Sequence, residues 1–282
     1  MKIAVVGSGP ASLQFLERTL RSQSSEAISL IDIYDYRSDP TVSNNPEYPF
    51  AIGMESSWLY LQEPEGLAAY LKDSACALST KTFRTADWTK DPIEIPSNGR
   101  MTLQPMFCSA YLSWIKEKTM HQSSIKLSFN YNHKVLHADP SKGILTFSTP
   151  SEKLSSQTYD LIVGGDGATS VVRHCISSQH SVTSEKSFIP SMWKCIAIDC
   201  ADLAGIKNFY RVDKIIGGVF WMPNNRTHIL TFWNPTDGDS NTLNTLQNPA
   251  TLQNEESIIK FLDRILLGKV DRQQLRDKAK EF

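Results

Sequence analysis

Residues 2–21, KIAVVGSGPASLQFLERTLR, carry the clearest structural pattern in the chain. Its apolar run from Lys2 to Val6 ends at Gly7 and predicts a short buried strand. Apolar residues then recur at helical spacing, which predicts a helix over Pro10–Arg21. A second apolar run, Ile28 to Tyr34, predicts another strand. Together these segments predict a β-α-β unit with parallel strands and a right-handed crossover.

The glycine-rich turn inside this unit has the position and spacing of a dinucleotide-binding turn. Gly7 would make the tight turn, Gly9 would let a pyrophosphate approach the backbone, and the helix N-terminus would offer oriented N–H donors. Ser12, a small residue, stands where a third glycine is usual. A plain strand–helix turn is the alternative interpretation. The candidate cofactor-binding residues of this turn are Gly7, Gly9, Pro10, Ala11 and Ser12.

A dinucleotide site also needs an acid at the end of the second strand, where it accepts hydrogen bonds from ribose hydroxyls. Asp32 lies inside the apolar alternation, whereas Asp35 lies at the end of the strand. Asp35 is therefore the candidate, and a solvated turn acid is the alternative.

A second strand–glycine–helix junction occurs at residues 159–173, YDLIVGGDGATSVVR. The strand from Asp160 to Val163 runs into Gly-Gly-Asp-Gly, and a short helix follows. Three glycines are entropically costly for a simple corner, so the junction favours a site where backbone approaches a ligand. Asp166 and Gly167 are its candidate residues.

The rest of the pattern predicts an α/β chain with two regions. A helix is expected over Arg100–Met120, and strands follow from Ile125. Apolar runs between residues 192 and 233 predict a second, mainly antiparallel sheet. We expect two domains, residues 1–180 and residues 181–282. A segment inserted into the first domain, at about 64–98, is expected to belong partly to the second.

Composition excludes several classes of protein. The 282 residues carry a formal net charge of −1, so no basic excess exists for general nucleic-acid binding. The five cysteines form no CxxC pair, and no histidines have ligand or triad spacing, so we expect no metal site and no catalytic side chain of that kind. The absence of a signal-peptide layout and of a membrane-length apolar run predicts a cytoplasmic protein without a membrane segment.

The two junctions, read together, resemble those of FAD-dependent aromatic-ring monooxygenases, and among these the kynurenine 3-monooxygenases most closely. The resemblance implies a Rossmann-like FAD-binding domain interleaved with a smaller, mainly antiparallel substrate domain. It implies that Arg100 begins a helix and contacts the flavin side, and that the Val135 backbone meets the adenine. Arg84 is a candidate for a substrate carboxylate contact, with a surface arginine as the alternative. The implied FAD residues are those of both junctions together with Asp35, Tyr36, Arg37, Arg100 and Val135.

The resemblance also implies the activity, that of an oxidoreductase and flavoprotein. NAD(P)H would reduce the FAD, O₂ would form a C4a-hydroperoxyflavin, and one oxygen would be delivered to a small aromatic substrate. The cofactor carries this chemistry, so no side chain need act as a nucleophile.

One departure from the pattern is the third FAD motif, Gly-Asp-Ala. Gly238-Asp239 lies in a polar stretch with no strand before it. The chain is therefore expected to lack about the last third of the family's length, with a second chain as a possible source of that motif. A non-catalytic or split flavoprotein is one alternative. A flavin-dependent halogenase or reductase on the same scaffold is the other.

Overall fold

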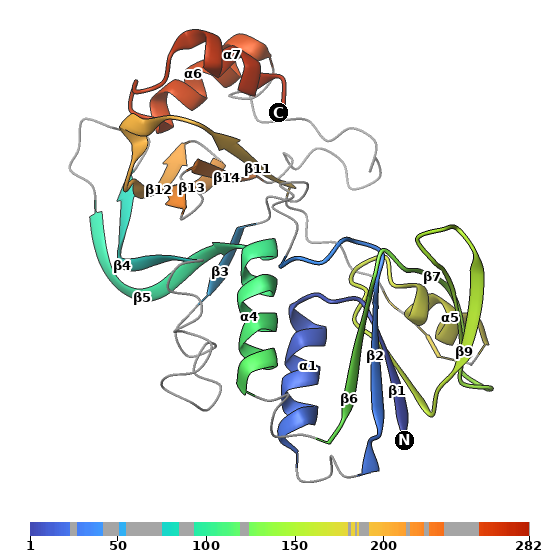
Figure 1. Ribbon diagram of the computed structural model, residues 1–282. Helices are drawn as coiled ribbons and strands as arrows, with labels where there is room; N and C mark the ends of the chain where they lie inside the picture. The colour runs from blue at the N-terminus through green and yellow to red at the C-terminus, as the bar shows by residue number, and fades with distance from the viewer. Residues whose placement is uncertain are drawn as a thin grey trace. The chain divides into compact units, whose positions relative to one another are not determined.

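The computed structural model divides the chain into two compact units, which we describe separately (Figure 1). Unit 1 comprises residues 1–46 and 105–186, and unit 2 comprises residues 47–104 and 187–282. The assignment of a cofactor to one unit and a substrate to the other stays a prediction. The structure describes residues 1–22, 27–41, 51–54, 75–84, 93–118, 124–179, 182–183, 185, 192–212, 215–222, 226–233 and 254–281.

Unit 1 is built on a parallel sheet of four described strands in the order β10-β1-β2-β6. Its first three elements confirm the predicted β-α-β unit, since β1 pairs in parallel with β2 and helix α1 connects them. β6 pairs in parallel with the outer side of β2, and β10 with the outer side of β1. The bounds are β1 Lys2–Val6, α1 Pro10–Arg21, β2 Leu30–Asp35, β6 Lys126–Tyr131 and β10 Leu161–Gly164.

Both faces of this sheet are covered, as parallel sheets require. Helix α1 and helix α4 (Gln104–Lys118) lie side by side on one face (Figure 1), and the Arg21 guanidinium lies 5.1 Å from the centre of the Trp114 ring. The other face packs on helix α5 and a three-stranded antiparallel sheet, in one core with Tyr34 and Val135. These elements are β7 Lys134–Asp139, β8 Ile144–Ser148, β9 Leu154–Thr158 and α5 Val171–Gln179.

Unit 2 is built on a larger sheet of seven described strands, in the order β11-β14-β13-β12-β4-β5-β3. All its pairs are antiparallel except that of β12 with β4. Helices α6 and α7 pack on it through a shared apolar core. The elements are β3 Ala51–Met54, β4 Ala75–Arg84, β5 Ile93–Leu103, β11 Met192–Ile198, the 3-10 turn Ala201–Leu203, β12 Lys207–Val212, β13 Ile215–Met222, β14 Arg226–Trp233, α6 Glu255–Ile265 and α7 Arg272–Ala279.

The predicted class, α/β with a parallel sheet and a mainly antiparallel sheet, is confirmed at this level. The domain with the mainly antiparallel sheet was expected to be the smaller one, yet this sheet has seven described strands and the parallel sheet has four. Segments far apart in the sequence make up this sheet: β4 comes from residues 75–84 and its parallel neighbour β12 from residues 207–212.

The predicted helix over Arg100–Met120 begins later than expected. Arg100 lies on strand β5, where it pairs with Met54 of β3 and with Ala77 of β4. Helix α4 begins at Gln104, with Pro105 in its first turn, where the missing N–H of proline is harmless. The ladder on both sides of β5 therefore overrides the helical spacing at Arg100. Of the predicted inserted segment 64–98, the structure describes residues 75–84 and 93–98.

Among the described helices, none combines the length and the apolar composition needed to cross a membrane.

Candidate functional site

The first glycine turn packs backbone to backbone against the second junction. Gly7 has φ +90, and its N–H donates to the Tyr34 carbonyl over 2.7 Å. A Cβ on Gly7 would lie 2.5 Å from the Gly165 carbonyl oxygen. The Gly165 N–H in turn donates to the Val6 carbonyl over 2.8 Å. The two junctions, 158 residues apart, therefore form one structure at the carboxyl ends of β1 and β10, and a side chain at Gly7 would separate them.

The N-terminus of α1 borders a space that the described residues leave open. Gly9 is its N-cap residue, with ordinary backbone angles of φ −74 and ψ 177, and Pro10 follows as the first helical residue. A Cβ on Gly9 would find its nearest heavy atom 4.0 Å away. The Ala11 and Ser12 N–H groups precede the first intrahelical donor, Leu13, which bonds to the Gly9 carbonyl. Two N–H donors and the positive end of the helix dipole therefore lie beside a space that the described residues leave open at Gly9, which suits an anion.

Ser12 carries a buried polar atom without a partner. The residue is 2% exposed, and its Oγ has no hydrogen bond among the described residues. A Cβ on Gly165 would come within 2.0 Å of this oxygen, so a side chain at position 165 would force the Ser12 hydroxyl to another rotamer. A buried hydroxyl left unpaired is unfavourable by about 1–3 kcal/mol. The hydroxyl at the third position of the turn is therefore a group that a bound ligand could satisfy.

Asp35 lies where the sequence predicts it, at the end of β2, and is 3% exposed. Ser8 donates to it twice, through its backbone N–H (2.7 Å) and its hydroxyl (2.6 Å). Arg37 donates three times, through its backbone N–H (2.9 Å), Nε (3.0 Å) and Nη2 (2.7 Å). Burial alone would raise the pKa of Asp35, but the hydrogen bonds and charge of Arg37 and the Ser8 hydroxyl outweigh it and lower the pKa below its ordinary value.

These five donors already occupy the roughly four lone-pair positions of a carboxylate. A ribose hydroxyl would have to replace one of them, so the predicted role of Asp35 as a ribose acceptor stays a prediction. What the geometry does show is that Asp35 fixes both Ser8 and Arg37. Sequence reasoning missed Ser8, although a hydroxyl between two glycines, facing the acid at the next strand end, was the available signal.

Tyr36 and Arg37 border this site. The Tyr36 side chain is 61% exposed, and the Arg37 guanidinium lies 5.7 Å from the centre of its ring. Tyr131, in register with Asp35 on β6, has a buried hydroxyl without a hydrogen-bond partner among the described residues. Burial is the main reason that the pKa of Tyr131 is raised. The pattern of alternating apolar residues in β6 gave no sign of this hydroxyl.

Hydrogen bonds within residues 166–173 stabilise the second junction. Asp166 accepts hydrogen bonds from the Ser170 hydroxyl and from the backbone N–H of Val171 (2.6 Å), so it caps the N-terminus of α5. Arg173 reaches back and donates to the Gly167 carbonyl (3.3 Å) and to the Ala168 carbonyl. Gly167 has φ +81, with no heavy atom within 4 Å of a Cβ added there. Asp166 thus has a structural use, and its predicted contact with a cofactor stays a prediction.

The other candidate residues lie on three strands. Val135 is buried on β7, which in the described sheet is an edge strand, so half of its backbone groups point away from the ladder. Its predicted backbone contact with an adenine is compatible with that position. Arg84 and Arg100 lie on β4 and β5 of unit 2, and their side chains are outside the described part of the structure.

A dinucleotide cofactor fits what unit 1 offers at the carboxyl ends of its parallel strands, the usual ligand edge of such a sheet. The N-terminus of α1 suits a pyrophosphate, and the Ser12 and Tyr131 hydroxyls, which have no partner among the described residues, suit a polar ligand.

Comparisons with known proteins gave matches of two kinds, and no family model matches the chain. The chain is 29% identical to the monooxygenase penA of Penicillium thymicola over 190 residues, which are 63% of this chain and 40% of that protein. The p-nitrophenol 4-monooxygenase PnpA of Pseudomonas putida DLL-E4 superimposes with a TM-score of 0.63 at 13% identity, over 96% of this chain and 64% of that one. The Diels-Alderase PyrE3 superimposes with a TM-score of 0.59 at 12% identity, over 96% of this chain and 53% of that one.

These matches correct one prediction. The predicted assignment to the FAD-dependent aromatic-ring monooxygenases, with kynurenine 3-monooxygenase as the closest member, is wrong, because no family model matches and the similar proteins found are other enzymes. The chain spans less than two thirds of the length of the proteins just described. The structural matches, all at low sequence identity, show a shared fold. The relative found by sequence, from Penicillium thymicola, is a monooxygenase. The predicted second chain gains no support from them.

Proposed function

We propose that this chain binds FAD and serves an FAD-dependent monooxygenase reaction on a small aromatic substrate, with NAD(P)H as co-substrate. The observation that carries the proposal is the paired glycine junction. Gly7 and Gly165 pack backbone on backbone, and the N-terminus of α1 beside them opens on space that no side chain fills. Such an arrangement is what a Rossmann-like site presents to a pyrophosphate.

The pyrophosphate would be held by the N–H groups of Ala11 and Ser12, with the Ser12 hydroxyl as a further donor. Gly9 keeps the space in front of them clear. When bound, FAD supplies the redox chemistry and the activation of O₂. The chain's contribution is binding, orientation and the exclusion of water, so no side chain is assigned as an acid, base or nucleophile.

Asp35 acts here through its neighbours. Its hydrogen bonds hold the Arg37 guanidinium at the end of β2, with 35% of the Arg37 side chain exposed. A cation fixed there is available to the phosphate or adenosine part of the cofactor, because guanidinium donors point in several directions at once. Tyr36 beside it offers an exposed ring for stacking. Val135 would contribute backbone groups to the adenine.

The reaction class rests on the names of the similar proteins. The relative from Penicillium thymicola is a monooxygenase, and PnpA is a monooxygenase of p-nitrophenol, an aromatic compound. An aromatic substrate is therefore proposed for this chain as well. Arg84 and Arg100 of unit 2 remain the proposed contacts to a substrate carboxylate and to the flavin side.

An alternative is a flavoprotein that performs no oxygenation. The observation in its favour is that a Diels-Alderase shares the fold with a TM-score of 0.59. Fold alone does not fix the reaction.

The first experiment is a visible absorption spectrum of the purified 282-residue chain, before and after equilibration with FAD. Flavin bands that remain after gel filtration support the proposal, and a folded, colourless protein that gains none contradicts it. Arg37→Gln should weaken FAD binding at least tenfold. Arg276→Gln, an equal change of charge on exposed helix α7, should leave it unchanged.

The second experiment measures NADH and NADPH oxidation by the FAD-loaded chain with and without phenols and aromatic acids. Oxidation that an aromatic compound stimulates, together with a hydroxylated product, supports the monooxygenase. Stable FAD binding without any product supports the alternative flavoprotein.

A further inference from the structure

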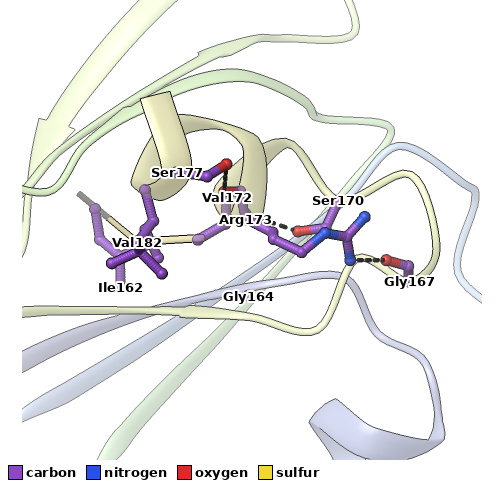
Figure 2. A pocket seen from close by; sticks show the side chains of 9 residues that line it. Ile162, Gly164, Gly167, Ser170, Val172, Arg173, Ser177 and Val182 are labelled. Carbon is purple, nitrogen blue, oxygen red and sulfur yellow. Dashed lines mark hydrogen bonds between the residues drawn. The ribbon is translucent and has the colours of Figure 1, made fainter. Parts of the chain in front are cut away.

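A groove of about 280 Å³ lies in unit 1 between strand β10 and helix α5 (Figure 2). Its polar end, at Gly167 and Arg173, belongs to the second glycine junction, and its apolar end lies outside the proposed cofactor site. One wall is strand β10, at the edge of the described parallel sheet. The other wall is one face of α5, which carries Val172, Arg173, Ile176 and Ser177. The lining residues are Ile162, Gly164, Gly167, Ser170, Val172, Arg173, Ile176, Ser177 and Val182.

One end of the groove is apolar. Val182 is 53% exposed although its side chain is aliphatic, and Ile162 and Ile176 are only half-buried. Figure 2 shows Val182 and Ile162 together at this end. Exposed aliphatic side chains that converge on a groove are what a ligand would cover, and covering them is favourable by about 25 cal/mol per Å².

The other end holds one cation. Two guanidinium nitrogens of Arg173 donate to the carbonyls of Gly167 and Ala168, which leaves about three of its five N–H groups for a ligand. Neither carbonyl carries a compensating charge. No carboxylate of the described residues pairs with Arg173, and the nearby Asp166 already accepts hydrogen bonds from Ser170 and the start of α5.

The hydroxyls of the groove do not compete with Arg173. Ser170 donates to Asp166, and Ser177 donates to the carbonyl of Arg173 one turn earlier over 2.8 Å. Among the described lining residues, the Arg173 guanidinium is the charged group, and it has donors to spare. Its preferred partner is a carboxylate, whose two oxygens match the planar arrangement of guanidinium N–H groups.

We propose that this groove is a binding site for a small monocarboxylate with an aryl or branched-alkyl body. The carboxylate would lie at Arg173 and the apolar body between Ile162, Ile176 and Val182. A volume of about 280 Å³ suits a single ring with a short acid side chain, since a cavity of about 150 Å³ already admits benzene. The site needs no cofactor, so the proposal stands apart from the proposed function.

The groove shares its polar end with the second junction. Gly167 and Ser170 line it, and the same turn contacts Gly7 through Gly165. A bound acid would therefore lie against the turn that supports the first glycine junction.

The test is a titration of the full chain, without added FAD, with sodium benzoate, followed by ligand-observed NMR. We expect saturable binding, and at least tenfold weaker binding of benzamide, which has the same shape without the charge. Arg173→Gln should weaken benzoate binding at least tenfold. Arg276→Gln, the matched loss of an exposed arginine, should change it less than twofold.

A second variant removes the space rather than the charge. Ser177→Phe places a ring in the groove, outside the buried core, and should abolish benzoate binding while the circular dichroism spectrum and melting temperature stay near those of the wild type. The proposal fails if the wild type shows no saturable binding, if benzamide binds as well as benzoate, or if Ser177→Phe binds unchanged. If Arg173→Gln does not fold, the benzamide and Ser177→Phe results decide.

Discussion

Replacement of Gly7 by alanine should destabilise unit 1 through two separate effects. The first is backbone strain, because φ +90 is unfavourable for alanine by about 1–3 kcal/mol. The second is a collision, since the new Cβ would lie 2.5 Å from the Gly165 carbonyl oxygen and 2.8 Å from its carbon. Both are backbone atoms that no rotamer change can move, so we add about 1–3 kcal/mol for overpacking. The expected loss is about 2–6 kcal/mol.

Two other glycines separate these effects. Gly167 has φ +81 but open space around a Cβ, so Gly167→Ala should show the strain alone, about 1–3 kcal/mol. Gly9 has φ −74 and a nearest atom at 4.0 Å, so Gly9→Ala should change stability by less than about 1 kcal/mol. Its methyl group would instead occupy the space in front of the α1 N-terminus and weaken FAD binding at least tenfold.

The assay is urea denaturation followed by circular dichroism, with FAD affinity measured separately by flavin fluorescence. The expected order of stability is wild type, Gly9→Ala, Gly167→Ala and Gly7→Ala, while FAD affinity should fall in Gly9→Ala although its fold is intact. A Gly7→Ala protein as stable as Gly9→Ala would refute the packing of the two junctions. Unchanged FAD affinity in Gly9→Ala would refute the role given to the α1 N-terminus.

Two further predictions concern single side chains. Asp166→Ala should destabilise the protein by about 0.5–2 kcal/mol in urea denaturation, because it removes the cap on α5. Asp263→Ala, which removes a carboxylate from the exposed side of α6, is the comparison, and equal losses would contradict the cap. His228 is 3% exposed, and burial, with help from Arg226, lowers its pKa to about 4. As the pH decreases from 6.5 to 4, the His228 imidazole takes up a proton in the unfolded chain but not in the folded chain. The free energy of unfolding should therefore decrease over this range, by on the order of 3 kcal/mol in all. A His228→Gln protein, measured by urea denaturation at each pH, should lose this dependence of stability on pH. An unchanged pH dependence would contradict the role given to His228.

The parts of the fold that the sequence predicted are those set by local pattern. The run from Lys2 to Val6, the turn at Gly7 and the leucines of α1 each agree with one structure, and the strand, turn and helix appear with the expected bounds. The second junction at residues 159–173 was equally readable, because its strand, its glycines and its helix follow one another without interruption. Asp35 lies at a strand end, as its position after an apolar run indicates.

Other features depended on partners far away in the sequence. Arg100 has neighbours typical of a helix, yet β3 and β4 pair with both edges of its segment and keep it extended. The size of the second sheet could not be predicted, because its strands come from two separate stretches of chain, residues 51–103 and 192–233. The five hydrogen bonds to Asp35 and the cap that Asp166 forms on α5 are closer in the sequence, but they depend on side-chain geometry that the apolar pattern does not predict.

The β-α-β unit, its glycine turn and the existence of a second junction follow from the sequence, because strand and helix periodicity and glycine backbone freedom are local properties. The contact between the two junctions, the hydrogen bonds of Asp35 with Ser8 and Arg37, and the groove beside α5 follow from the packing of the chain. The junctions are 158 residues apart, Ser8 and Asp35 are 27 residues apart, and the groove forms where β10 and α5 pack together, so no local pattern could predict them. Their proximity is set by the packing of the whole unit.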